Sequence, residues 1–232
     1  MSLFTTSFID FFLPRECISC SRKLTYEEES ICEKCYSQIK YAGLSFLDSE
    51  FEKKFQKDSL IKDFLSLFIF EEESPVRSLL HGLKYQNRFR IGNFLGKILA
   101  ANFEDKINNW NPDLIIPIPL HKLKKAERGY NQSYYIAKGL GKRIGIPVKT
   151  NVIIRNKFTS TQTKLNAENR KENIRNAFSV IKEKDIIGKN IILLDDVITT
   201  GATVSECSKT LKKFRTGNIY ALSVGIADYV NT

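Results

Sequence analysis

Unbroken apolar runs alternate with amphipathic segments along most of this 232-residue chain. Four apolar residues in succession at 191–194 are typical of a strand that is buried on both faces of a parallel sheet. The run at 114–119 contains two prolines, which must lie at the end of a strand because proline cannot donate to a sheet ladder. Further strands are expected at residues 65–70, 146–154, 177–181 and 219–227.

Helical spacing of apolar residues fills the intervals between these runs. It predicts helices from Pro75 to about residue 83, at 91–103 and at 203–214, and a further helix that ends near Gly145. Cys207 shares the apolar face of the last helix and is expected to be a buried core thiol. Strands alternating with helices predict an α/β fold with a mostly parallel sheet flanked by helices.

The length allows one α/β domain of ordinary size with a small appendage. We expect an N-terminal helix and metal module at 1–40, a connecting segment at 41–74 and the main domain at 75–232. The net charge of +10 is unevenly spread, because residues 121–190 contain 17 Lys or Arg against 5 Asp or Glu. Such a field attracts phosphates, whether on a small molecule or on a nucleic acid.

Four of the five cysteines form two close pairs, Cys17 with Cys20 and Cys32 with Cys35, separated by eleven residues. Two C-x2-C pairs joined by a short excursion predict a tetrahedral structural Zn²⁺ site. A disulfide framework is the alternative, but no secretory signal supports it. Residues 1–13 are rich in apolar side chains, but they lack a basic start, contain Asp10 and are too short to span a bilayer. We therefore expect a cytoplasmic protein without a membrane span.

The strongest candidate site follows the apolar run at 191–194. Two adjacent carboxylates, Asp195 and Asp196, come where that strand is expected to end, and a turn follows that consists of Thr199, Thr200, Gly201, Ala202 and Thr203. Ligands bind at the carboxyl ends of parallel strands, and the start of a helix suits a phosphate. The carboxylates are placed to accept hydrogen bonds from sugar hydroxyls, so a sugar phosphate is expected. The alternative is an ordinary strand-turn-helix with a capping threonine.

This order of acids and threonines resembles the phosphoribosyl-pyrophosphate (PRPP) motif of the type I phosphoribosyltransferases. Together with the cysteines, further segments resemble the ComF family of competence-associated, phosphoribosyltransferase-like proteins, and the resemblance covers nearly the whole chain. These segments are His81 to Tyr85, Pro117 to His121, Arg128 to Gln132, and Thr161, Gln162, Leu165, Arg170, Asn173 and Phe178.

The resemblance implies roles for individual residues. Asp195 and Asp196 would hold the ribose 2′ and 3′ hydroxyls, and Thr199 to Thr203 would hold the 5-phosphate. The pyrophosphate, neutralised by Mg²⁺, would face Lys84 and a loop containing Pro119, Leu120, His121 and Arg128. A turn role for His121 and a bracing role for Arg128 and Asn131 remain open. The basic loop at 156–175 would close over the site.

Three functions fit these features. The first is a competence factor that has a PRPP-type site and works on incoming single-stranded DNA, with a DNA-uptake helicase as a partner, as the family name implies. The second is a metabolic transferase that moves phosphoribosyl to a small base or amine, similar to an amidophosphoribosyltransferase. The third is a non-catalytic scaffold. The residues do not identify an acceptor, because acceptor pockets in this fold come from variable loops.

Overall fold

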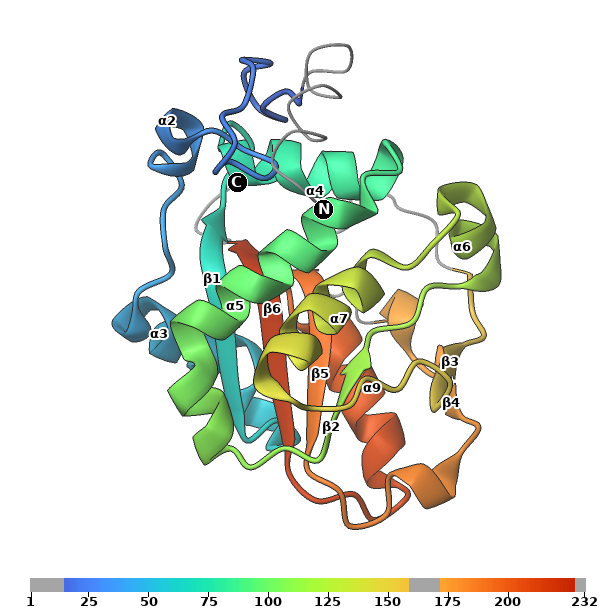
Figure 1. The fold of residues 1–232 in the computed structure, drawn as a ribbon. Helices are drawn as coiled ribbons and strands as arrows, with labels where there is room; N and C mark the ends of the chain where they lie inside the picture. The colour runs from blue at the N-terminus through green and yellow to red at the C-terminus, as the bar shows by residue number, and fades with distance from the viewer. Residues whose placement is uncertain (1–14, 159–171, 228–232) are drawn as a thin grey trace.

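The computed structural model of the protein describes residues 15–158 and 172–227, and its centre is a four-stranded parallel sheet (Figure 1). The strand order is β1-β6-β5-β2. The strands are β1 (Asp63–Phe70), β2 (Leu114–Pro117), β5 (Ile191–Ile198) and β6 (Ile219–Ala227). All neighbours in this sheet run parallel. This arrangement confirms the predicted α/β class with a parallel sheet flanked by helices, to which a small N-terminal cysteine cluster is added.

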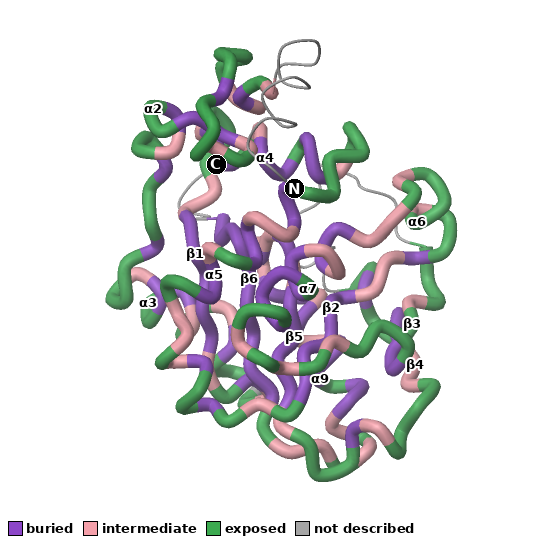
Figure 2. Tube along the Cα trace, viewed as in Figure 1, coloured by how far each residue is buried: buried purple, intermediate pink, exposed green. Residues whose placement is uncertain are grey.

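Helices cover both faces of the sheet. One face carries α5 (Phe89–Asn109) and α7 (Gln132–Ile144), and α9 (Ala202–Lys212) lies behind the sheet (Figure 1). Because β5 and β6 are central, side chains on both of their faces are removed from water, and all nine residues of β6 are buried (Figure 2). Each fully buried Leu, Ile or Val side chain stabilises the fold by roughly 1.5–3 kcal/mol.

Helices α5 and α7 pack closely because glycines face each other at their contact. A Cβ atom on Gly96 would lie 2.2 Å from the Ile136 carbonyl oxygen, and one on Gly139 would lie 2.4 Å from the Asn93 carbonyl oxygen. Helix α5 also extends beyond its predicted end at residue 103. The extension buries Ile107 and brings Trp110 to stack on Tyr220.

The strand predicted at 146–154 is wrong for most of its length. Only β3 (Ile153–Arg155) is a strand, and it pairs antiparallel with β4 (Phe178–Val180) in a separate two-stranded sheet. Val148 reaches the main sheet only through an isolated bridge to Ile115. Pro147 precedes this bridge and has no N–H with which to extend a ladder. The predicted strand at 177–181 exists as β4 but lies outside the main sheet.

The segment at 41–74 contains more than a connection. It holds α3 (Leu44–Lys54), the short 3₁₀ helix η1 (Gln56–Asp58) and β1, which is the edge strand beside β6. Helix α4 (Pro75–Tyr85) follows, with Ser74 as its N-cap. The shorter helices are α2 (Glu33–Tyr36), α6 (Lys122–Arg128) and η2 (Glu183–Asp185).

Two predicted features fall outside the residues that the structure describes. They are the N-terminal amphipathic helix and residues 159–171 of the basic loop. Within residues 15–158 and 172–227, no helix combines the length and the apolar content needed to cross a bilayer.

Candidate functional site

The carboxyl ends of β2 and β5 form the site, and the chain topology explains why. After β2 the chain continues into α7 on one face of the sheet, whereas after β5 it continues into α9 on the other face. The two loops therefore diverge at adjacent, parallel strands. A crevice at such a switch point is the usual ligand site of an open α/β sheet.

The two predicted carboxylates lie within β5, which corrects the expectation that the strand ends before them. Ladder pairing with β6 continues through Asp195 opposite Ser223 and on to Ile198 opposite Ile226. The strand continues because β6 lies beside it over this whole length and offers partners for its backbone groups. The acids are therefore held on a rigid strand, a more precise support than a loop.

Side chains from two helices contact the acid pair. The Lys84 ammonium, in the last turn of α4, lies 2.9 Å from Asp196 Oδ2. At the start of α7, Gln132 Nε2 donates to the same oxygen at 3.3 Å, and Ser133 Oγ donates to Asp195 Oδ1 at 3.2 Å. Predicted residue Lys84 is thus part of this site. Ser133 was missed, although its position directly after the Arg128 to Gln132 segment could have indicated it.

The acid pair has an unusual electrostatic state. Burial, followed by the adjacent charge of Asp196, raises the pKa of Asp195 to about 7. Arg155 of β3 and Cys207 of α9 also lie close enough to interact with Asp195. Burial raises the pKa of the Cys207 thiol, which confirms the expectation of a buried core cysteine. Asp195 therefore changes its charge near neutral pH.

The threonine-rich turn forms a small hollow beside Asp195. Residues 197–204 line a volume of about 30 Å³ together with that carboxylate. Gly201 is the N-cap of α9 and has φ +75°, a left-handed conformation that favours glycine. A Cβ atom there would lie 2.8 Å from the Phe55 ring, so the turn is also packed from behind. The predicted Thr199 to Thr203 segment is therefore a tight turn at a helix start.

The loop after β2 borders a larger cavity of about 710 Å³. Pro119, Leu120 and His121, the residues expected to face a pyrophosphate, line it. Opposite them lie residues 150–156, which include Arg155, a residue that the sequence interpretation did not single out. The described residues around this cavity include Lys122, Lys125 and Arg155 and no Asp or Glu, so its charge favours an anion.

Structural roles account for some residues of this loop. His121 Nδ1 accepts the backbone N–H of Leu123 at the start of α6. Asn131 caps α7 by accepting the Ser133 N–H, while its amide donates to the Ile118 carbonyl at 2.9 Å. Arg128 does not line the cavity; its guanidinium lies over the Tyr85 ring at 5.2 Å. His121 and Asn131 thus brace the loop, and Arg128 points to α4.

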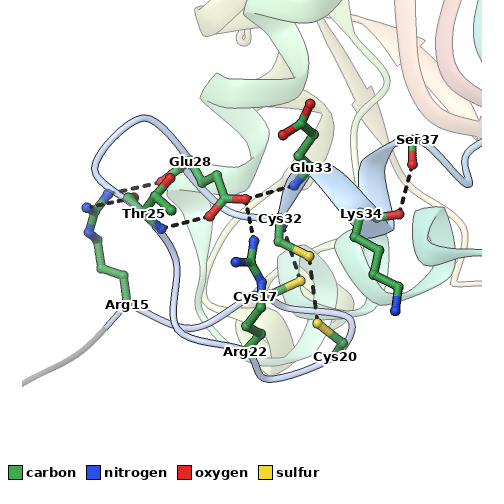
Figure 3. A network of polar contacts seen from close by, with 10 residues as sticks. All are labelled: Arg15, Cys17, Cys20, Arg22, Thr25, Glu28, Cys32, Glu33, Lys34 and Ser37. Atoms are coloured by element: carbon green, nitrogen blue, oxygen red, sulfur yellow. Dashed lines mark hydrogen bonds and ion pairs between the residues drawn. The ribbon is translucent and has the colours of Figure 1, made fainter.

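The four N-terminal cysteines form a second site. Their Sγ atoms all lie within 4.8 Å of one another. Figure 3 draws Cys17, Cys20 and Cys32, and Cys20 Sγ is 3.7 Å from Cys32 Sγ. Four thiolates at a Zn–S distance of about 2.3 Å around one tetrahedral ion would be separated by about 3.8 Å. All the cysteines are free thiols. The cluster can therefore hold one metal ion, and its spacing fits zinc.

Hydrogen bonds around the cluster hold its loops in place. Glu28 accepts the backbone N–H groups of Thr25 and Glu33 and pairs with Arg22 at 2.6 Å (Figure 3). The Thr25 and Glu33 N–H groups hold the pKa of Glu28 below its usual value. The Cys32 N–H donates to Cys17 Sγ at 3.3 Å, which fixes the Cys17 side chain within the cluster.

Comparisons with known proteins identify relatives. No protein-family model matches the chain. Competence protein F of Haemophilus influenzae is 31% identical over 212 residues, which cover 87% of this chain and 93% of that protein. The DNA utilization protein YhgH of Escherichia coli K12 is 31% identical over 140 residues, 59% of this chain and 61% of that protein.

Among solved structures, the glutamine PRPP amidotransferase of Bacillus subtilis, in complex with ADP and GMP, is similar with a TM-score of 0.41 and 18% identity. The match covers 62% of this chain and 30% of that one. The match to competence protein F spans 87% of this chain and 93% of that protein at 31% identity. This chain therefore belongs to the ComF family of competence-associated, phosphoribosyltransferase-like proteins.

Proposed function

We propose that the crevice between β2 and β5 binds PRPP, or ribose 5-phosphate, together with Mg²⁺. The observation that carries this proposal is the placement of an acid pair and a tight helix-start turn beside a cavity with cationic walls. Carboxylates accept from sugar hydroxyls, whereas phosphates need N–H donors and cations. Both requirements meet at the ends of two adjacent strands.

Each group has a defined part in this proposal. Asp195 and Asp196 accept hydrogen bonds from the ribose hydroxyls, and the backbone and hydroxyl groups of Thr199 to Thr203 surround the 5-phosphate. Lys84, within reach of Asp196, and the loop of Pro119 to His121 face the pyrophosphate. Mg²⁺, when bound, supplies charge neutralisation for the pyrophosphate. Arg155 and the lysines of α6 add positive charge to the cavity.

Calorimetry with Mg²⁺ and PRPP tests this site. The double variant Asp195→Asn and Asp196→Asn should lose the binding heat, because the amides no longer present two anionic acceptors, and a thermal melt should show that it is folded. Asp105→Asn is the matched control, since Asp105 is exposed on α5. Binding by the double variant with wild-type affinity would mean that the ligand lies elsewhere.

We propose further that the protein acts on single-stranded DNA during DNA uptake. The names of its relatives, competence protein F and DNA utilization protein, support this partner, as does the excess of 12 positive charges at residues 121–190. A DNA-uptake helicase would act beside it. In this proposal the cysteine cluster holds a structural Zn²⁺.

A metabolic transferase is the second candidate, supported by the PRPP-type motif. The two functions differ in what stimulates pyrophosphate release from PRPP. Single-stranded DNA should stimulate release, or bind without turnover, if the DNA function holds. Adenine, guanine, hypoxanthine or ammonia should stimulate release if the metabolic function holds. If one of these small molecules serves as the acceptor and the protein binds no DNA at any salt concentration, the metabolic function replaces the DNA proposal.

A further inference from the structure

The connection between α4 and α5 carries exposed aromatic rings among arginines. All residues from 85 to 90 are exposed, with Tyr85 at 56% and Phe89 at 44%. Arg88 and Arg90 flank Phe89 directly. We call Tyr85, Arg88, Phe89, Arg90, Arg128 and Tyr135 the aromatic–arginine surface. Rings that are this exposed leave much of their apolar surface open to a partner.

Ring contacts make this surface continuous. The Phe89 ring lies 5.2 Å from the Tyr135 ring, and Tyr135 lies 5.2 Å from both Tyr130 and Tyr134. The three tyrosines line the cavity of about 710 Å³ beside the β2 loop. Phe89 lines a different cavity of about 490 Å³, which includes Arg15 and other residues of the cysteine module. A row of rings thus joins the two cavities.

The charged residues of this surface are all arginines, whereas Glu16 and Glu29 of the cysteine module line the adjoining cavity and Glu29 pairs with Lys97 at 2.7 Å. No Asp or Glu occurs between residues 74 and 103. Among the described residues, the guanidinium groups of Arg88 and Arg90 form no hydrogen bond or ion pair. Arg128 lies over the Tyr85 ring and donates to its hydroxyl at 3.3 Å, which fixes both side chains. Two of the three arginines are therefore available to an anionic partner.

We propose that the aromatic–arginine surface is the track along which single-stranded DNA runs from the cysteine module to the β2 cavity. Phe89 stacks on a base, Tyr85 stacks on another with the face that Arg128 does not cover, and Arg88 and Arg90 contact phosphates. Alternating rings and cations are the usual means of binding an unpaired strand, because only unpaired bases offer free faces. This inference rests on the proposed DNA function and identifies the surface that performs it.

Fluorescence anisotropy with a fluorescein-labelled oligo-dT strand tests the stacking. Phe89→Leu and Tyr85→Leu should each weaken binding by roughly tenfold, a value within the range for loss of one base–aromatic stack. Phe89→Trp should retain the wild-type affinity, because it keeps a stacking face. Ile187→Ala is the control for loss of an exposed apolar side chain, since Ile187 is 54% exposed and outside this surface. PRPP binding should be the same in all variants.

Salt dependence tests the arginines. The combined change Arg88→Gln and Arg90→Gln should reduce the log–log salt slope by about 0.7 for each phosphate contact that is lost. Arg143→Gln, at the far end of α7, should leave the slope unchanged.

The outcomes separate this inference from the proposed function. If the wild-type protein binds the strand and the leucine and glutamine variants bind equally well, the aromatic–arginine surface is not the track, although the DNA function stands. If the wild-type protein does not bind the strand even at low salt, the DNA function is overturned and the inference with it. Weaker DNA binding by Phe89→Leu, together with wild-type binding by Phe89→Trp, supports stacking and excludes a general effect of side-chain volume.

Discussion

The Lys84 ammonium lies 2.9 Å from Asp196 Oδ2 and so joins the end of α4 to the carboxyl end of β5. Only 23% of the Lys84 side chain and 10% of the Asp196 side chain are exposed. This pair places a cation at the crevice and holds one carboxylate of the acid pair in a single orientation. The two residues belong to segments that the sequence interpretation connected only through a family resemblance.

Removing this ion pair should destabilise the protein measurably. Lys84→Met keeps the length of the side chain but leaves Asp196 without its cation. A fully buried carboxylate left without its cation would lower the free energy of unfolding by about 3–5 kcal/mol. Because Lys84 and Asp196 are both partly exposed, we expect a loss of about 1–2 kcal/mol. Urea denaturation at neutral pH measures the difference. Lys97→Met is the control, because the Lys97–Glu29 pair is about half exposed and should contribute less than about 0.5 kcal/mol. Equal losses of stability in Lys84→Met and Lys97→Met would contradict a stabilising role for the Lys84–Asp196 pair.

The turn at Gly201 should not tolerate a side chain. Gly201→Ala adds backbone strain at φ +75° and a Cβ atom 2.8 Å from the Phe55 ring. The expected loss of stability is about 2–3 kcal/mol, with weaker PRPP binding. Gly145→Ala has a similar φ of +73° but nothing within 4 Å, so it measures the strain alone. Thermal or urea unfolding of the two variants would show whether the Phe55 contact adds its own cost.

Asp195 should make stability depend on pH with an unusual sign. Its pKa is raised to about 7 in the folded protein from an ordinary value of 3.8, so between these values the folded state binds more protons than the unfolded state. Stability therefore falls as pH rises from about 4 to about 7, by about 1.4 kcal/mol per unit of pKa shift.

Asp195→Asn should remove this dependence, since the amide does not titrate. The variant should be more stable than the wild-type protein at pH 8, and the two should converge near pH 4. Urea denaturation across this range is the measurement. Asp105→Asn, at an exposed position of α5, should follow the wild-type curve. A wild-type protein that is more stable than Asp195→Asn at pH 8, by a difference that shrinks as the pH falls, would show that the pKa of Asp195 is lowered instead.

The cysteine cluster should bind metal in a defined ratio. Protein purified without chelator should contain about one Zn²⁺ per chain, because four thiolates complete one tetrahedral site. Cys17→Ser should lose the metal and unfold the module. Cys207→Ser should retain it, since Cys207 is buried on α9. Metal-free protein with the same melting curve as the metal-loaded form would contradict a structural role.

Local patterns in the sequence determined the elements that depend on neighbouring residues. Strand β6 has the predicted bounds of 219–227, because a central strand needs apolar residues on both faces and its pattern is continuous. Helix α7 ends as predicted beside Gly145, which has the positive φ that a helix C-terminus requires. The cysteine spacing likewise predicted a cluster that the structure brings within 4.8 Å.

Only the tertiary structure decided how distant segments meet. The extension of β5 through Asp195 depends on β6 lying beside it, and β3 is short because it pairs only with the three residues of β4. The contacts of Asp196 with Lys84 and Gln132, and the row of rings from Phe89 to Tyr134, join residues from separate helices. No local periodicity encodes such contacts, because they arise from the packing of helices on a common sheet.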